Sequence, residues 1–196
     1  MTLSEGLIYV LGFLTEAEER DLLAVLAAFE LHPYVLHDTP SRRLVRSFGL
    51  ALVTGAYDTG PAAPVPAELD WLKERCAALM GREPGELADL LVTRYPPGAG
   101  SAGTAMHRSS ATSAASLQAA CRMLFRRGQP RARQTAELTL EPRSAYVLSC
   151  QPPSPAGPGQ PLCGFAPPAS GDAGRWLDWS GEGSSLVCVG WVGERG

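Results

Sequence analysis

Histidine is scarce in this chain, and only one of its three histidines lies in a segment where a metal site could form. His107 stands within residues 101–115, SAGTAMHRSSATSAA. An open-sided ferrous site takes two histidines and one carboxylate, and residues two apart on a strand share a face. The residue two positions after His107 is Ser109, so this candidate metal ligand has no carboxylate partner at that spacing. The other histidines, His32 and His37, are typical of surface or capping positions.

The cysteines indicate a cytoplasmic protein, and the charge balance bears on its partners. Five cysteines are scattered without C-x-x-C spacing, and their odd number, with no signal peptide, points to reduced thiols. The formal charge of -3 argues against binding to nucleic acid by charge alone. The arginines within residues 126–133 form either a local basic patch or a solvated loop between strands. No apolar run has the length of a membrane span, so no membrane partner is expected.

The elements that would position these side chains are those of one domain that mixes helices and strands. The chain has 196 residues, of which 45% are hydrophobic and 19% charged, and this suits a single core. Thr15 followed by Glu18 is a capping-box pattern at the start of a helix over residues 16–29. The spacing of apolar residues predicts a second helix over residues 68–80. Strands are predicted within residues 6–15 and 32–52, and over residues 90–95, 116–125, 136–140 and 144–149.

Glycine and proline mark two segments in which no regular structure is predicted. Residues 55–66 are rich in Pro, Gly and Ala and predict a loop. Residues 150–183 show neither strand alternation nor a helical period and predict a disordered linker. We therefore divide the chain into a domain over residues 1–149 and an atypical Pro/Gly-rich tail over residues 150–196.

Within the domain, three segments follow one another in an informative order. They read LLVTRYPPGAG (90–100), SLQAACRMLFRRG (116–128) and AELTLEPRSAYVLS (136–149). In order and spacing they resemble the bacterial AlkB-like branch of the 2-oxoglutarate/Fe(II) dioxygenases. The resemblance implies an α+β fold, a double-stranded β-helix (jelly roll) with N-terminal helices packed on one face. It also implies Fe(II) and 2-oxoglutarate as cofactors and the demethylation of alkylated DNA or RNA bases flipped out of the stack; we expect a monomer.

Few residues take a role from this resemblance. Tyr95 matches the family tyrosine that hydrogen-bonds 2-oxoglutarate, although packing of a strand-end aromatic on the sheet would explain it as well. Arg43, Phe48 and Gly49 match the R-x-V-x-x-F-G element near the substrate-binding lid, and a hairpin turn is the alternative. His107 lies close to the place of the family's first iron ligands but stands later after PPGAG.

The family's metal-binding motifs are missing from the chain as written. Gly100 is followed by SAGTAMHRSSATSAA where the family has G-W-H-x-D, and Ser149 by CQPPSPAGPGQ where it has W-x-H-S-I. The closing R-x-S-x-T-F-R strand, whose first arginine pairs with 2-oxoglutarate, is missing too. The chain is therefore either an oxygenase by descent that is inactive as written, or a non-catalytic jelly-roll remnant that acts as a binding protein. A small-molecule hydroxylase of the same superfamily is a third possibility.

A change of reading frame would account for the first missing motif. Codons that can encode residues 101–115, read one nucleotide earlier, can also encode IGWHRDAPVFGDVGG, one of many readings that they permit. The chain has a single lysine, a single isoleucine and no asparagine, which indicates a GC-rich gene and favours that reading. Divergence is the alternative, but it would alter ligands singly and not replace a whole window. We expect residues 101–115 to be poorly organised, because Ala, Ser and Thr cannot replace the aromatic and aliphatic residues of a core strand.

Overall fold

The computed structural model describes residues 7–36, 39–52, 59–61, 63–97, 99, 111–127, 134–149, 177–178 and 186–193. These residues form two α-helices, two 3₁₀ turns and twelve strands. In chain order the elements are β1 (Leu7–Val10), α1 (Glu16–Ala27), β2 (His32–Leu36), β3 (Thr39–Phe48), β4 (Leu50–Leu52), β5 (Thr59–Pro61), η1 (Ala67–Leu69), α2 (Asp70–Met80), η2 (Pro84–Glu86), β6 (Leu87–Tyr95), β7 (Ala111–Leu117), β8 (Cys121–Arg127), β9 (Gln134–Leu140), β10 (Ser144–Ser149), β11 (Leu177–Asp178) and β12 (Leu186–Gly193).

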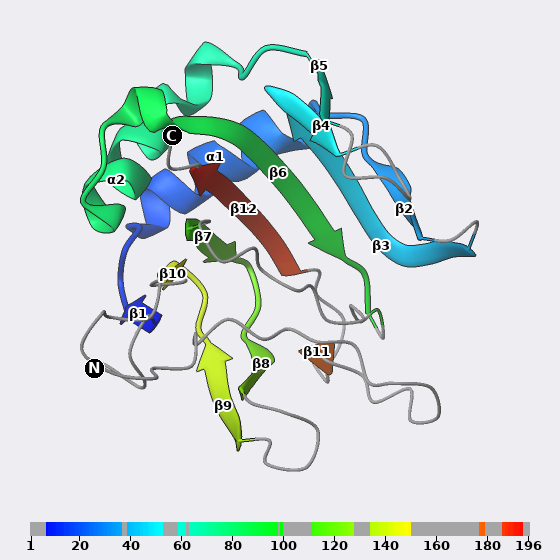
Figure 1. The fold of residues 1–196 in the computed structure, drawn as a ribbon, viewed down its shortest axis with the longest axis vertical. Helices are drawn as coiled ribbons and strands as arrows, with labels where there is room; N and C mark the ends of the chain where they lie inside the picture. Colours follow the sequence, from blue (N-terminus) through cyan, green and yellow to red (C-terminus); the bar gives the residue numbers. More distant parts are fainter. Residues whose placement is uncertain are drawn as a thin grey trace, which may run out of the picture.

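The strands form antiparallel sheets of different size (Figure 1). The large sheet has seven strands in the order β1-β10-β7-β12-β6-β3-β2. A small sheet has three strands in the order β11-β8-β9, and β4 and β5 pair in a hairpin. Neither α-helix of the described residues is both long and apolar enough to cross a membrane.

Both α-helices pack on one face of the large sheet (Figure 1). Alternate residues of β6, Leu90 and Val92, point to this face and contact a cluster that includes Leu22 of α1 and Leu72 of α2, all fully buried. The opposite face, marked by Tyr95, meets the small sheet in a second and smaller apolar cluster. The period of two along β6 therefore gives the sheet two buried faces.

The two predicted helices are confirmed, with shorter bounds. The Thr15 side chain accepts from the backbone N–H of Glu18 at 3.2 Å, and the Glu18 carboxylate accepts from the backbone N–H of Thr15 at 2.7 Å. This is the capping box that the sequence predicts for α1. Helix α2 begins after η1 and ends at Gly81, whose φ of 65° is the left-handed C-cap conformation that glycine adopts readily.

Three predictions about the middle of the chain are wrong. Residues 116–125 are not one strand, because β7 and β8 belong to different sheets and the chain turns between them at Gln118, which has a φ of 69°. The predicted loop over residues 55–66 contains the short strand β5. Part of the segment expected to be poorly organised, residues 111–115, is a buried strand, because β10 and β12 pair with β7 on its two sides.

The segment after residue 149 contributes a central strand. Strand β12 pairs with β7 on one side and β6 on the other, at the middle of the large sheet. The division at residue 149 therefore does not separate β12 from the sheet. The rest of the predicted linker, apart from β11, lies outside the described residues.

Candidate functional site

The candidate site lies between the two sheets, at the end of β6. Tyr95 is 7% exposed and packs with Cys121 and Met123 of β8 and Leu140 of β9. Tyr146 of β10 lies at the edge of the same cluster. Tyr95 is thus held between the two sheets against apolar side chains, and its role toward 2-oxoglutarate remains a prediction.

A row of hydroxyl side chains crosses the large sheet on this same face. In the strand register Ser144 pairs with Ser116, and β12 separates Ser116 from Thr93 of β6. All three residues are buried. The Ser144 hydroxyl donates to the carbonyl oxygen of Glu141 at 2.6 Å, whereas the Ser116 Oγ has no hydrogen-bond partner. The site therefore presents hydroxyl groups where a metal centre would need stronger donors.

The residues described on this face do not fit Fe(II). Strand β7 presents Thr112, Ala114 and Ser116 toward the space between the sheets, without an imidazole or a carboxylate. Asp89 of β6 points to the same face. Strand β12 lies between β6 and β7, so Asp89 is two strand spacings from β7, about 10 Å in all. Within the described part of the chain, no three His, Cys, Asp or Glu side chains lie close enough to hold a metal. His107, the predicted ligand, lies outside the described residues.

The residues predicted near a substrate lid lie in three different surroundings. Phe48 points to the helix face, where its ring centroid is 5.0 Å from that of Phe29. Arg43 points to the other face, and its guanidinium lies 3.8 Å from the ring centroid of Tyr34 on β2. Gly49 has a φ of 85° and donates its N–H to the Ala63 carbonyl, so it makes the bend after β3. The substrate role of the three remains a prediction, and only Arg43 lies on the face of Tyr95.

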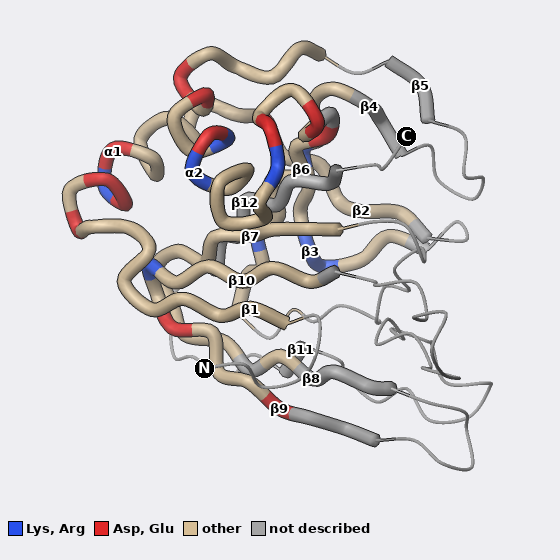
Figure 2. The backbone as a smooth tube through the Cα atoms, turned by 60° about the vertical axis from the view of Figure 1, so that its left-hand side comes forward, with Lys and Arg blue, Asp and Glu red and all other residues tan. Residues whose placement is uncertain are grey.

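A basic strand lies next to this site. Strand β3 carries three arginines and pairs with β6, whose Arg94 lies opposite Leu44. One of the three, Arg42, donates to the carbonyl oxygen of Pro97 just after β6 at 3.1 Å. Figure 2 shows these basic positions on β3, while acidic positions gather on the helices. The sequence gives no local sign of Tyr34, since its contact with Arg43 depends on the pairing of β2 with β3.

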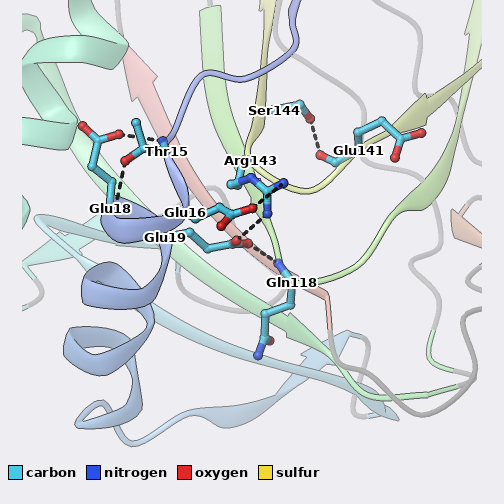
Figure 3. Close-up of polar contacts among 8 residues, drawn as sticks. All are labelled: Thr15, Glu16, Glu18, Glu19, Gln118, Glu141, Arg143 and Ser144. Atoms are coloured by element: carbon cyan, nitrogen blue, oxygen red, sulfur yellow. Dashed lines mark hydrogen bonds and ion pairs between the residues drawn. The ribbon is translucent and has the colours of Figure 1, made fainter.

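A buried carboxylate on α1 is already engaged by donors (Figure 3). Glu19 is 9% exposed and accepts from the backbone N–H of Gln118 at 2.7 Å and from Arg143 Nη1 at 3.1 Å. Arg143 has a φ of 61° and donates its own N–H to the carbonyl oxygen of Ser116. Glu19 therefore joins α1 to the turn after β7 and, through Arg143, to the turn before β10.

No family model and no curated protein matches the sequence. The fold, however, is similar to those of solved 2-oxoglutarate/Fe(II) oxygenases. An oxidoreductase of the 2OG-Fe(II) oxygenase family from Burkholderia pseudomallei has a TM-score of 0.56 at 11% identity, over 97% of this chain and 85% of its own. The non-heme α-ketoglutarate-dependent epimerase SnoN from nogalamycin biosynthesis has a TM-score of 0.55 at 11% identity, over 96% and 78%. OsALKBH1 has a TM-score of 0.53 at 9% identity, over all of both chains. At these identities the likeness shows the fold alone, a mixed α/β arrangement shared with 2-oxoglutarate/Fe(II) oxygenases, one of them an AlkB homologue.

Proposed function

We propose that this chain is built on the jelly-roll scaffold of the bacterial AlkB-like oxygenases, which act on alkylated nucleobases, and that the polypeptide as written does not turn over. The observation that carries the proposal is that an oxygenase-like arrangement of sheets surrounds residues with no metal-binding cluster, within the part of the chain that the structure describes. Strand β7, which lies inside the large sheet between β10 and β12, presents Thr112, Ala114 and Ser116 toward the small sheet. A ferrous centre needs imidazole and carboxylate donors, and hydroxyl and methyl groups do not replace them.

The direct test is an assay for oxygenase activity. Purified protein with added Fe(II), 2-oxoglutarate and a methylated oligonucleotide is expected to produce no succinate above a no-protein control. Iron-dependent succinate production clearly above that control would refute the proposal.

The nucleic-acid part of the proposal is supported by the basic strand β3. Arginine binds phosphate through paired N–H groups and also stacks on aromatic rings and bases. Arg43 already lies against Tyr34, on the same face as Tyr95. An arginine over an aromatic ring next to the candidate site suits a single-stranded or flipped base.

A local change of reading frame over residues 101–115 would explain why the metal ligands are missing. Replacement of this segment by IGWHRDAPVFGDVGG places a histidine and an aspartate two residues apart, so that on a strand both reach one metal. The replaced protein is expected to bind Mn(II) or Fe(II) weakly, through two ligands. Turnover is expected to stay absent until the H-S-I and R-x-S-x-T-F-R segments are restored as well.

The control for that experiment is the same replacement with alanine in place of its histidine and aspartate. Equal metal binding by the two replaced proteins, or none by either, would remove the physical support for the change of frame. The nucleotide sequence across the codons for residues 100–116 would show directly whether the motif lies in the adjacent frame.

A second candidate function is a non-catalytic protein that binds a partner on this scaffold. The absence of a metal-binding group among the described residues favours it, and the basic strand β3 could still contact an anionic partner. One experiment distinguishes the two candidates. Turnover by the protein with all three segments restored would support an oxygenase origin, and its absence would support the non-catalytic binding protein.

A further inference from the structure

A small pocket lies where α1 meets the start of α2. It has a volume of about 170 Å³. The residues that line it are Glu18, Asp21, Leu22, Val25, Glu68 and Trp71. Both helices pack on the face of the large sheet opposite to Tyr95. The sheet therefore separates this pocket from the candidate site, and the pocket has no part in the chemistry considered there.

The inner part of the pocket is apolar. Leu22 of α1 is 2% exposed, and Val25 and Trp71 are partly buried against the large apolar cluster. Residues three apart on a helix are neighbours on its surface, so Leu22 and Val25 form one continuous side of the pocket, and the indole of Trp71 comes from the other helix. Surroundings of this kind can cover the aliphatic stem of a long side chain.

The rim of the pocket is acidic, and part of its charge is not balanced. The Asp21 side chain is 76% exposed and lies 3.6 Å from the equally exposed Arg20, a pair that contributes little. Glu68 is exposed and forms no ion pair with any residue that the structure describes. Acidic positions gather on these helices (Figure 2). The rim therefore offers two carboxylates to an external cation.

The protein already holds one guanidinium group beside this pocket. Arg75 Nη1 lies 2.7 Å from Glu18 Oε1, and its guanidinium carbon lies 5.9 Å from the ring centroid of Trp71. A carboxylate and an indole together thus contact one cation, by charge and by the electrostatic attraction of the ring. Arg75 balances the charge of Glu18, so Asp21 and Glu68 remain to attract a second cation of the same kind.

We propose that the pocket receives an arginine side chain from a basic segment of a partner protein. A guanidinium group stacks on an aromatic ring and pairs with carboxylates better than an ammonium group does, which favours arginine over lysine. Exposed ion pairs and exposed cation–π contacts are each weak, so a small free cation would bind poorly. A segment that carries the arginine adds contacts with the acidic surface of α1, and arginine often anchors protein interfaces. The inference does not rest on the proposed function.

Binding of an end-blocked, fluorescently labelled GRGRG peptide to the full chain tests the proposal. The Kd is measured by fluorescence anisotropy for E68Q, which removes a rim charge, and for W71F, which keeps an aromatic ring but weakens its attraction for a cation. Each is expected to raise the Kd about two- to fivefold. E30Q is the matched control, because Glu30 is an exposed acidic residue that does not line the pocket. If W71F is unstable, D21N replaces it, with the same expected effect.

The proposal requires that both pocket variants weaken binding and that E30Q does not. Any other pattern overturns it, because equal weakening by E30Q would mean that the peptide responds to the charge of the whole surface. Agmatine, a free guanidinium compound, is expected to bind more weakly than the peptide. If it binds as tightly, the pocket serves a small cation and the proposal of a protein partner is overturned. No metal or 2-oxoglutarate enters the experiment, so its failure is distinguishable from failure of the proposed function.

Discussion

The face of the large sheet that meets the helices and the face that meets the small sheet differ in what their residues provide. On the helix side, Leu90 of β6 and Leu117 of β7 pack with α1 and α2 in one large apolar cluster. On the other side the cluster around Tyr95 is smaller, and β7 presents Ala114 and Ser116. A core needs apolar area of any suitable shape, while a metal site needs particular donors at particular positions. Many sequences can therefore meet the needs of the core, whereas few meet those of a metal site.

The largest loss of stability is expected when a core side chain on the helix side is truncated. Leu72→Ala removes a fully buried side chain of α2 and should cost about 2–5 kcal/mol of unfolding free energy. Met123→Ala, in the smaller cluster on the other face, should cost less than Leu72→Ala because fewer buried groups surround it. Leu11→Ala is the control, since Leu11 is 64% exposed and should change stability by less than about 0.5 kcal/mol. Urea unfolding measures all three, and a greater loss for Met123→Ala would reverse the comparison of the faces.

The next effect concerns the carboxylate that ties the helix side to the turns. Glu19→Gln keeps the size of the side chain but removes the charge that Arg143 contacts at 3.1 Å, which should cost about 1–3 kcal/mol. Glu16→Gln is the matched control, because the Glu16 side chain is 86% exposed and lies 3.9 Å from Arg143. An exposed pair at that distance contributes little. Equal losses for the two variants would show that burial does not strengthen the Glu19 contact.

On the opposite face, binding of single-stranded DNA tests the basic strand. Arg43→Ala should weaken binding by about tenfold or less and lower the salt dependence by about one phosphate contact. Arg20→Ala on the acidic helix α1 is the control and should leave binding unchanged, since its side chain is 75% exposed and α1 packs on the other face of the large sheet from Arg43. If both variants bind DNA as the unaltered chain does, β3 has no part in nucleic-acid contact.

The smallest effect is a pH dependence at the start of α1. The hydrogen bond from the Thr15 backbone N–H holds the pKa of Glu18 below its ordinary value, and Arg75 acts in the same direction. A carboxylate with a lowered pKa in the folded state stabilises the protein above its unfolded pKa, and this contribution is lost as the pH falls through the folded pKa. Glu18→Gln should therefore flatten the fall of the melting temperature in that acidic range. Glu74→Gln, at an exposed position on α2, is the control that should leave the profile unchanged.

The sequence by itself determined the helices and most of the strand segments. A capping box and an apolar period are local patterns, so Thr15 and Glu18 mark the start of α1 without knowledge of the rest of the chain. The same kind of pattern located β6, β9 and β10. The absence of a carboxylate near His107 could also be read directly from the residue types.

Only the tertiary structure decided which strands pair and which surroundings each side chain points into. Strand β12 was not predicted, because a strand that follows a Pro/Gly-rich segment gains its place only by pairing with β6 and β7. The partners of Glu19 are 99 and 124 residues away in sequence. Phe48 and Arg43 lie in one short motif, yet their side chains point to opposite faces of the sheet. Side-chain direction alternates along a strand, and long-range pairing decides what each direction meets, so no local pattern contains that information.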